Sequence, residues 1–266
     1  MNVGPQFIHL ELSSFCNKKP PGCSMCGRRK LERKYPELCD WGNIEFELVK
    51  EISKQVLQGT VVQFHGNGEP TLYPQLGEAL KLFKHCIRSF NTNGKLLIEK
   101  ADEIIGNLET LVISVIQDDL ESDEQYSTVC DFIRSKGIRK PSLVFRILGK
   151  VDKRERWYGL PGVITTRILH DPDGSRNYEK RVTIPEIGIC LDLLTHLAIN
   201  RYGEVSVCVR FDPEKHGVIG NLKYHTLDEI WNGKVRKHYI DSHLDGLRHT
   251  LNLCGKCDFY GVPTSP

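Results

Sequence analysis

The feature that most constrains this chain is the regular alternation of strand-like and helix-like segments over its first two-thirds. Short apolar runs typical of buried strands are separated by longer segments whose apolar residues recur at helical spacing. Strands that alternate with helices of this length predict βαβ units and a parallel sheet. The expected strands are 7–13, 61–66, 87–94, 110–117, 142–149 and 162–170, and the expected helices are 44–59, 75–86, 95–108 and 122–137. This order predicts an α/β fold, a partial (β/α)6 TIM-like barrel.

The last third of the chain has a different pattern. The segment 196–209 reads as two strands joined by a tight turn. Further on, Thr226 and Glu229 have the spacing of a capping box at the start of a helix. We therefore predict a barrel domain over residues 1–180 and a small C-terminal α+β domain, built around cysteines, over residues 181–266.

Composition and the first residues bear on the compartment. The chain does not begin with a basic stretch followed by an apolar run, so no secretory signal is predicted. No stretch approaches 18 apolar residues, so we expect no membrane span and a cytoplasmic protein. Ten cysteines in a reducing compartment indicate metal binding or catalysis rather than disulfides. The net charge of +2 favours no polyanionic partner.

Seven of the ten cysteines fall into two groups near the chain ends. Cys16, Cys23 and Cys26 follow the first expected strand with the spacing C-x6-C-x2-C. Three thiolates suit soft metals. A [4Fe–4S] cluster held by three cysteines keeps one iron open for a substrate or cofactor, which a closed structural site does not. The second group consists of Cys190, Cys208, Cys254 and Cys257.

Polar residues follow several of the expected strands, at the edge where β/α barrels hold their chemistry. The second strand ends in "GNGEP", whose glycines allow close backbone approach and whose Glu69 offers a carboxylate for charge-assisted hydrogen bonds. The third strand ends in "NTNG". Ser114 lies in the fourth strand and Arg146 in the fifth. This placement favours an active site over a purely structural role.

The cysteine triplet and "GNGEP" together resemble the radical S-adenosylmethionine (SAM) enzymes. The family's usual spacing is C-x3-C-x2-C, so the first gap is wider here, and Met25 stands where an aromatic residue is usual. The resemblance implies a [4Fe–4S] cluster on Cys16, Cys23 and Cys26 whose open iron binds SAM. Cleavage of SAM then gives a 5′-deoxyadenosyl radical. It also implies SAM contacts from Gly66, Asn67, Gly68, Glu69, Pro70, Asn91, Asn93, Ser114 and Arg146.

The C-terminal cysteines extend the resemblance to nearly the whole chain. Their pattern, C-x12-G-x4-C followed by C-x2-C, is similar to that of the twitch domain, a shortened SPASM domain. The resemblance implies that Cys190, Cys208, Cys254 and Cys257 ligate one auxiliary [4Fe–4S] cluster. A structural zinc protein is the alternative for this quartet, but zinc does not account for the N-terminal triplet.

The resemblance implies a radical SAM oxidoreductase with a small hydroxylated substrate, sugar-like or aminocyclitol-like. The expected reaction is hydrogen abstraction and oxidation, with the auxiliary cluster accepting an electron. Because the first strand begins within ten residues of the start, we expect no N-terminal peptide-binding domain. A peptide-modifying enzyme is the alternative. The candidates for a substrate base are His9, Glu11, Arg167, His170, Arg210 and Asp212.

Two segments beside the cysteine triplet also carry predictions. The basic run 26–34 is interpreted as a solvated loop or as a docking face for a flavodoxin-type or ferredoxin-type electron donor. An RNA-modifying enzyme ranks last, so nucleic acid is not an expected partner. Segment 18–22, within the wide cysteine gap, is expected to bulge outward as a rigid insertion beside the active-site mouth while Cys16 still reaches the cluster.

Overall fold

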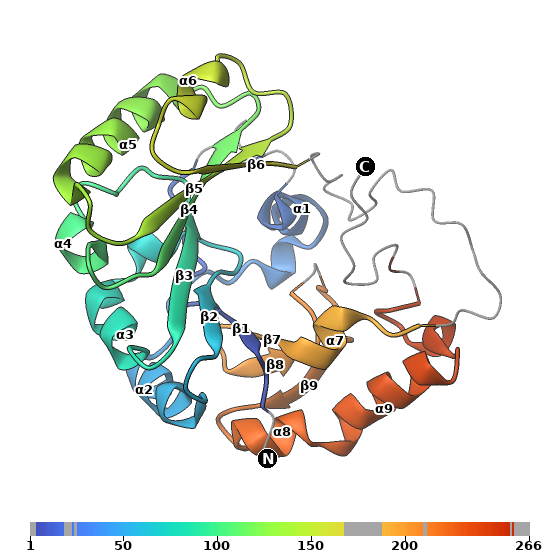
Figure 1. The fold of residues 1–266 in the computed structure, drawn as a ribbon. Helices are drawn as coiled ribbons and strands as arrows, with labels where there is room; N and C mark the ends of the chain where they lie inside the picture. The colour runs from blue at the N-terminus through green and yellow to red at the C-terminus, as the bar shows by residue number, and fades with distance from the viewer. Residues whose placement is uncertain are drawn as a thin grey trace.

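The protein is described by a computed structural model that covers residues 4–18, 23, 26–167, 188–209, 212–255 and 257. Its centre is a single mixed sheet in the order β6-β5-β4-β3-β2-β1-β7-β8-β9 (Figure 1). Neighbouring strands from β6 to β1 pair in parallel, and so do β1 and β7. The strands are β1 (Phe7–Leu10), β2 (Val61–Phe64), β3 (Ile87–Thr92), β4 (Thr110–Ile116), β5 (Ser142–Leu148), β6 (Val163–Arg167), β7 (His196–Ile199), β8 (Glu204–Ser206) and β9 (Val218–Asn221).

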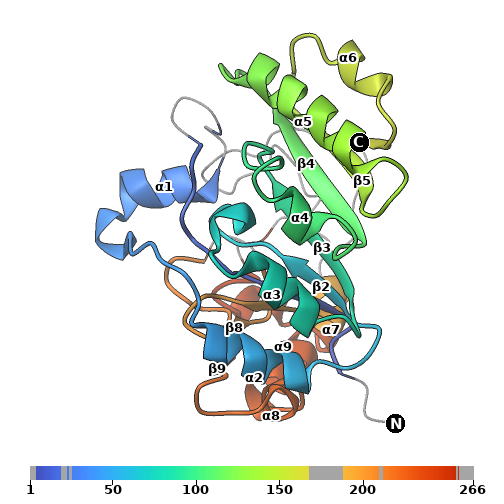
Figure 2. The same cartoon turned by 90° about the vertical axis from the view of Figure 1, so that its left-hand side faces the viewer.

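Helices cover one face of the parallel part of this sheet. Successive helices from α2 to α5 contact one another, and α2 also contacts α8; Figures 1 and 2 show this layer on the outer side of the sheet. The α-helices are α1 (Gly27–Lys34), α2 (Phe46–Gln55), α3 (Leu76–Leu82), α4 (Ala101–Ile104), α5 (Ser122–Lys136), α6 (Glu155–Tyr158), α7 (Leu191–Thr195), α8 (Leu227–Trp231) and α9 (Lys234–Leu244). Short 3₁₀ helices occur at η1 (Pro36–Leu38), η2 (Pro70–Leu72) and η3 (Arg248–Thr250).

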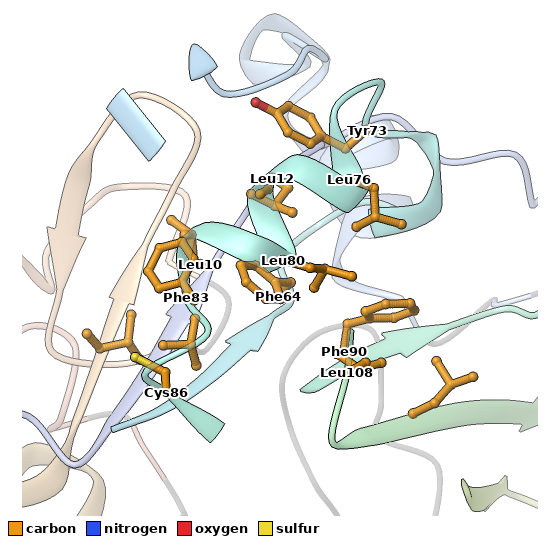
Figure 3. Packing of buried hydrophobic residues seen from close by; sticks show 14 of the residues in the cluster. Leu10, Leu12, Phe64, Tyr73, Leu76, Leu80, Phe83, Cys86, Phe90 and Leu108 are labelled. Carbon is orange, nitrogen blue, oxygen red and sulfur yellow. The ribbon is translucent and has the colours of Figure 1, made fainter. Parts of the chain in front are cut away.

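The main core lies between the sheet and its helices. Leu10, Phe64 and Phe90 stand side by side on neighbouring strands and are fully buried. Phe83, just beyond α3, meets Phe64 edge-on at a centroid distance of 5.5 Å (Figure 3). The alternation of buried and half-buried residues along β1 and β2 turns every second side chain toward this core. The other side chains of these strands face the opposite side of the sheet, where the candidate site lies.

The predicted α/β fold with parallel strands is confirmed, and all six predicted strands of the barrel part exist. Of the four helices predicted there, the prediction for 95–108 is largely wrong, because within this segment only α4 is helical. Asn93 Oδ1 accepts a hydrogen bond from Lys95 N at 3.0 Å, which begins this connection with a local turn. Gly106 then adopts a φ of +81°, outside the helical region. The helices α1, α6, α7 and α9 are not among the predicted elements.

The sheet and the main core continue from the barrel part into the C-terminal part. β7 pairs with β1, and Leu222, Ile230 and Trp231 belong to the same apolar cluster as the barrel residues. The predicted boundary near residue 180 lies outside the described residues, so the division into 1–180 and 181–266 stays a prediction. Within the described segments, no helix combines the length and the apolar character needed to cross a membrane.

Candidate iron–sulfur and cofactor site

The N-terminal cysteines lie together beyond the end of β1. Cys26 is the N-cap residue of α1, and its backbone N–H donates to Cys23 O at 2.9 Å. All three thiols are half-buried and free of disulfides. Burial raises the pKa of Cys23 to about 12, and the nearby thiols of Cys26 and Cys16 add to that rise. Crowded thiols that resist ionisation become thiolates when a metal centre supplies positive charge, so this donor set fits a soft metal cluster.

The helix α1 holds the cysteine segment in place. The guanidinium of Arg28 donates to Ser14 O and lies over the Trp41 ring, 3.7 Å from its centroid. Arg29 Nη2 donates to Lys18 O at 2.6 Å. The interpretation of 26–34 as a solvated loop is therefore wrong. Its first two arginines are engaged by backbone carbonyls because the segment forms a helix packed on the cysteine segment.

The glycines of "GNGEP" bring this loop against the cysteine segment. A Cβ on Gly68 would lie 2.2 Å from Ser13 O and 2.5 Å from Phe15 O. A Cβ on Gly66 would lie 2.5 Å from Glu11 Oε1. Gly68 therefore allows a close approach between two backbone segments, and Gly66 allows a close approach to the Glu11 side chain. The ends of β1 and β2 meet as the sequence predicts.

Glu69 is buried inside a cage of hydrogen-bond donors. Its Oε1 accepts from Thr71 Oγ1 and Thr92 Oγ1, both at 2.8 Å, and its Oε2 accepts from Asn93 N at 2.8 Å. Glu69 also caps η2 by accepting from Thr71 N, and Pro70, directly after Glu69, is the first residue of that turn. Burial raises the pKa of Glu69, and these donors act against that rise. Among the described residues Oε2 has one donor, so it has the larger remaining capacity to accept.

The two asparagines predicted as SAM contacts lie at the end of β3. Asn91 Oδ1 accepts from Gln63 Nε2 on β2 at 3.1 Å. Asn93 Nδ2 donates to Asn17 Oδ1 at 2.7 Å, which ties the end of β3 to the cysteine segment. Asn17 therefore belongs to the site, although sequence reasoning assigned it no role.

Ser114 and Arg146 are neighbours in register on β4 and β5, and both are half-buried. The carbonyl oxygens of Ser114 and Asn93 both accept hydrogen bonds from Gln125 Nε2, at 2.9 and 2.8 Å. Gln125 is buried in α5 and so joins the ends of β3 and β4. Sequence reasoning missed Gln125, because a glutamine on a helix gives no signal of a role at strand ends.

Among the candidate bases, His9 is the one surrounded by other imidazoles. Its ring centroid lies 6.1 Å from that of His65 and 5.9 Å from that of His196. Burial lowers the pKa of His9 to about 3, and the two neighbouring histidines contribute. A neutral imidazole with so low a pKa is a weak base. The structure therefore does not favour His9 as the substrate base.

Two other candidates are occupied by backbone donors. Glu11 Oε1 accepts from Asn67 N at 2.7 Å, and Oε2 accepts from Arg201 N at 3.2 Å. Asp212 accepts from two backbone N–H groups, those of residues 216 and 217. These contacts give both carboxylates structural roles. Arg167 ends β6, and His170 and Arg210 lie outside the described residues.

Lys18, expected in an outward bulge, instead points inward. Its Nζ lies 2.5 Å from Asp119 Oδ1 and 3.0 Å from Glu121 Oε2. Burial alone would lower the pKa of Lys18, but the hydrogen bonds to these carboxylates outweigh it and raise the pKa. The expectation of an outward bulge is therefore wrong for Lys18, because buried Asp119 and half-buried Glu121 in the β4–α5 connection attract its ammonium group. The predicted insertion at 19–22 lies outside the described residues.

The C-terminal cysteines approach one another from separate elements. Cys190 is the N-cap of α7, Cys208 follows β8, and Cys257 N donates to Cys254 O at 3.1 Å. Burial raises the pKa of Cys254 to about 12, with Cys257 and Cys190 as further causes. Buried Arg248 donates through both Nη atoms to Cys257 O at 3.0 Å. A second apolar cluster surrounds this group and includes Leu193, Val207, Tyr239 and Leu251.

The donor atoms of both candidate metal sites are thiol sulfurs. Within the described part of the chain, no three His, Cys, Asp or Glu side chains are close enough to hold one ion. An iron–sulfur cubane spreads its cysteine ligands around a larger body than one ion does. Purely thiol donors also fit iron–sulfur clusters by their softness.

Comparison with solved structures identifies the class of fold. BtrN in complex with AdoMet and 2-DOIA matches with a TM-score of 0.61 at 18% identity, over 100% of this chain and 98% of that chain. Streptococcus suis SuiB bound to the precursor peptide SuiA matches with a TM-score of 0.62 at 14% identity, over 90% of this chain and 67% of that chain. The structure of anSMEcpe with bound AdoMet and Cp18Cys peptide matches with a TM-score of 0.60 at 15% identity, over 90% of this chain and 84% of that chain.

The family model is more specific for the C-terminal part. Residues 190–258 match the SPASM family, an iron–sulfur cluster-binding domain. This segment contains Cys190, Cys208, Cys254 and Cys257. The predicted resemblance to radical SAM enzymes with a SPASM-type domain is thus confirmed, in fold over the whole chain and in sequence over this domain. No curated protein sequence matches the chain.

Proposed function

We propose that the protein is a radical SAM oxidoreductase acting on a small hydroxylated substrate. The observation that carries the proposal is the locked arrangement of the cysteine segment and the "GNGEP" loop at the ends of β1 and β2. This arrangement occurs in a fold that BtrN, solved with AdoMet, shares over 100% of this chain. When bound, SAM and a reduced [4Fe–4S] cluster supply a carbon-centred radical that abstracts hydrogen, and a second cluster can accept an electron.

In the proposed reaction, residues of this chain bind the first cluster and orient SAM. Cys16, Cys23 and Cys26 would hold the first cluster. The close backbone approach at Gly68 fixes the loop that would receive SAM, and Glu69 Oε2 would accept a hydrogen bond from the methionyl ammonium. Asn67 and Pro70 shape this loop.

The polar side chains beyond the loop would contact the rest of SAM. Asn91, Asn93, Ser114 and Arg146 lie at or near the ends of β3, β4 and β5. His170 is the candidate that remains for the base that accepts the substrate proton: the low pKa of His9 makes it a weak base, Glu11 and Asp212 accept backbone hydrogen bonds, and the guanidinium groups of Arg167 and Arg210 stay protonated.

The choice of a small substrate is supported by the extent of the structural matches. The structure of BtrN with 2-DOIA corresponds to this chain over 98% of its length, whereas the peptide-bound SuiB structure corresponds over 67% of its own. The anSMEcpe match, with a bound peptide, favours peptide modification as the second candidate. A flavodoxin-type or ferredoxin-type donor remains the expected partner.

The test is anaerobic reconstitution followed by incubation with SAM and a reductant. About eight irons per chain and release of 5′-deoxyadenosine are expected from two [4Fe–4S] clusters. Colourless, zinc-loaded protein after anaerobic purification contradicts the proposal. Deuterated sugars or aminocyclitols and deuterated peptides are then compared, and transfer of deuterium into 5′-deoxyadenosine identifies the substrate class.

A further inference from the structure

The wide gap between Cys16 and Cys23 contains a buried ion pair that the proposed function does not use. The side chains of Lys18 and Asp119 are each 2% exposed, and Lys18 Nζ lies 2.5 Å from Asp119 Oδ1 and 2.6 Å from Oδ2. Glu121 supplies a second carboxylate at 3.0 Å and is 32% exposed. Asp119 lies in the β4–α5 connection, so the pair joins two segments 101 residues apart in sequence.

The carboxylate is held in place by its own loop. Asp119 Oδ1 accepts a hydrogen bond from Glu121 N at 3.0 Å, which fixes the orientation of the acceptor. A buried ion pair adds little net stability, because desolvation offsets the attraction between the charges. We therefore expect the main effect of this ion pair to be the fixed position of Lys18, and its effect on the free energy of folding to be small.

Other contacts hold Asn17 by its side chain and Lys18 by its backbone. Arg29 Nη2 donates to Lys18 O at 2.6 Å, and Asn93 Nδ2 donates to Asn17 Oδ1 at 2.7 Å. The two residues after Cys16 are thus fixed by α1, by the end of β3 and by the β4–α5 connection. Only four residues of the sequence then separate the anchored Lys18 from Cys23. The entropy cost of closing a loop rises with its length. An anchor at Lys18 therefore lowers the entropy cost of bringing Cys16 and Cys23 to the same cluster.

We propose that Lys18 is a positioning residue, which docks on Asp119 and Glu121 and thereby holds Cys16 in place for the cluster. The inference rests on the proposed function, since that function assigns Cys16 to the cluster. Lys18 contacts neither substrate nor cofactor in this role. It acts through the backbone of the segment that bears Cys16.

The test compares Lys18→Met, the double variant Lys18→Met/Asp119→Asn, and Lys153→Met as the matched control. Lys153 also pairs with an aspartate, Asp123 in the first turn of α5, at 3.2 Å, but both side chains are more than two-thirds exposed. The double variant leaves no unpaired buried carboxylate at Asp119, so it keeps the experiment valid if the single variant fails to fold.

The first readout is the rate at which iodoacetamide alkylates Cys16 in the full chain before reconstitution, measured by mass spectrometry. In both Lys18 variants we expect Cys16 to react about tenfold faster, as when local opening becomes easier by about 1.4 kcal/mol. Cys190 should keep its rate, and Lys153→Met should change neither. The second readout is iron content after reconstitution, where the Lys18 variants should lose about four irons per chain.

A double variant that folds and keeps the wild-type alkylation rate of Cys16 overturns the inference, and so does full iron uptake in that variant. Failure of the proposed function gives a different result. In that case the wild-type chain itself takes up no iron at the N-terminal triplet, while the alkylation rates still show whether Lys18 fixes Cys16.

Discussion

At the scale of single residues, the site depends on the absence of side chains as much as on their presence. Gly68 has no room for a Cβ because the backbone oxygens of Ser13 and Phe15 occupy that space. Backbone atoms cannot move aside as the end of a long side chain can. The contact between the "GNGEP" loop and the cysteine segment is therefore specified by glycine.

Gly68→Ala should consequently separate the loop from the cysteine segment. We expect the free energy of unfolding to fall by about 1–3 kcal/mol, as for other overpacking substitutions, and SAM binding to weaken. Urea denaturation and calorimetric titration with SAM measure the two effects. Gly159→Ala is the control, since Gly159 has a negative φ and a Cβ added there would meet no atom within 4 Å. Equal behaviour of the two variants would contradict this account.

At the scale of elements, the sequence allows prediction of those parts whose signal is local. The strands of the barrel and the capping box of Thr226 at α8 were predictable from periodicity and spacing, and both are present. The helix α1 was not, because its sequence "GRRKLERK" has a single large apolar residue, Leu31. Its buried residues are Arg28 and Lys30, and Arg28 is held there by Ser14 O and Trp41. Helix prediction from hydrophobic periodicity cannot detect a helix that is held by such polar tertiary contacts.

The same reason explains which parts of the site were predictable. The cysteines and "GNGEP" are adjacent in sequence to the strands that position them. The contacts made by Lys18, Asn17 and Gln125 join segments far apart in the chain. No spacing rule connects Lys18 to Asp119, so the inward direction of Lys18 followed only from the structure.

An ion pair between Arg88 in β3 and Glu109, the residue before β4, gives a prediction about acid stability. Burial alone would raise the pKa of Glu109, but hydrogen bonds from the Arg88 side chain and backbone outweigh it and lower the pKa to about 2. Because the pKa is lower in the folded state, the pair stabilises the protein above the unfolded pKa of about 4.3 and loses this effect as the pH falls toward 2.

Glu109→Gln should therefore lower the free energy of unfolding at pH 6.5 by about 1–3 kcal/mol, and the difference from wild type should shrink on acidification from pH 4.5 to pH 3. Urea denaturation at a series of pH values measures this difference. Both proteins contain the same cysteines, so acid effects on metal sites cancel in the comparison. If the difference in free energy of unfolding between Glu109→Gln and wild type does not change with pH, the Arg88–Glu109 ion pair is not its cause.

At the scale of the whole molecule, one sheet joins the two thiol groups. Cys16 follows β1, and β7, which pairs with β1, lies in the segment between Cys190 and Cys208. Each group nevertheless has its own surroundings, with α1 around the first and a separate apolar cluster around the second. The two clusters should therefore form independently.

Replacing Cys16, Cys23 and Cys26 together with Ala should abolish SAM cleavage and leave about four irons per chain. The reciprocal variant, with Ala at Cys190, Cys208, Cys254 and Cys257, should also keep about four irons but retain the N-terminal site. Iron analysis and electron paramagnetic resonance after anaerobic reconstitution distinguish the two. Loss of all iron from the first variant would refute the assignment of separate ligand sets.

Glu11 links the barrel part to the C-terminal part through a single carboxylate. It follows β1, the strand between β2 and β7, and accepts from Asn67 N in the "GNGEP" loop and from Arg201 N in the β7–β8 turn. Glu11 is 5% exposed, so its carboxylate is buried, while the two contacts themselves are part-buried. We therefore infer for Glu11 a positioning role and not the role of substrate base.

The substitution Glu11→Gln tests this distinction, because an amide can replace one accepting oxygen but not both. The second backbone N–H then faces an amide NH2 group, which should cost about 1–3 kcal/mol of stability and weaken SAM binding by loosening the loop at Asn67. A base, by contrast, would leave its mark on the pH dependence of turnover. We expect the pH profile of Glu11→Gln to keep its shape, with Glu51→Gln on the exposed face of α2 as control. Loss of the acidic limb of the profile would instead make Glu11 the base, and the contacts to Asn67 and Arg201 would then serve to orient it.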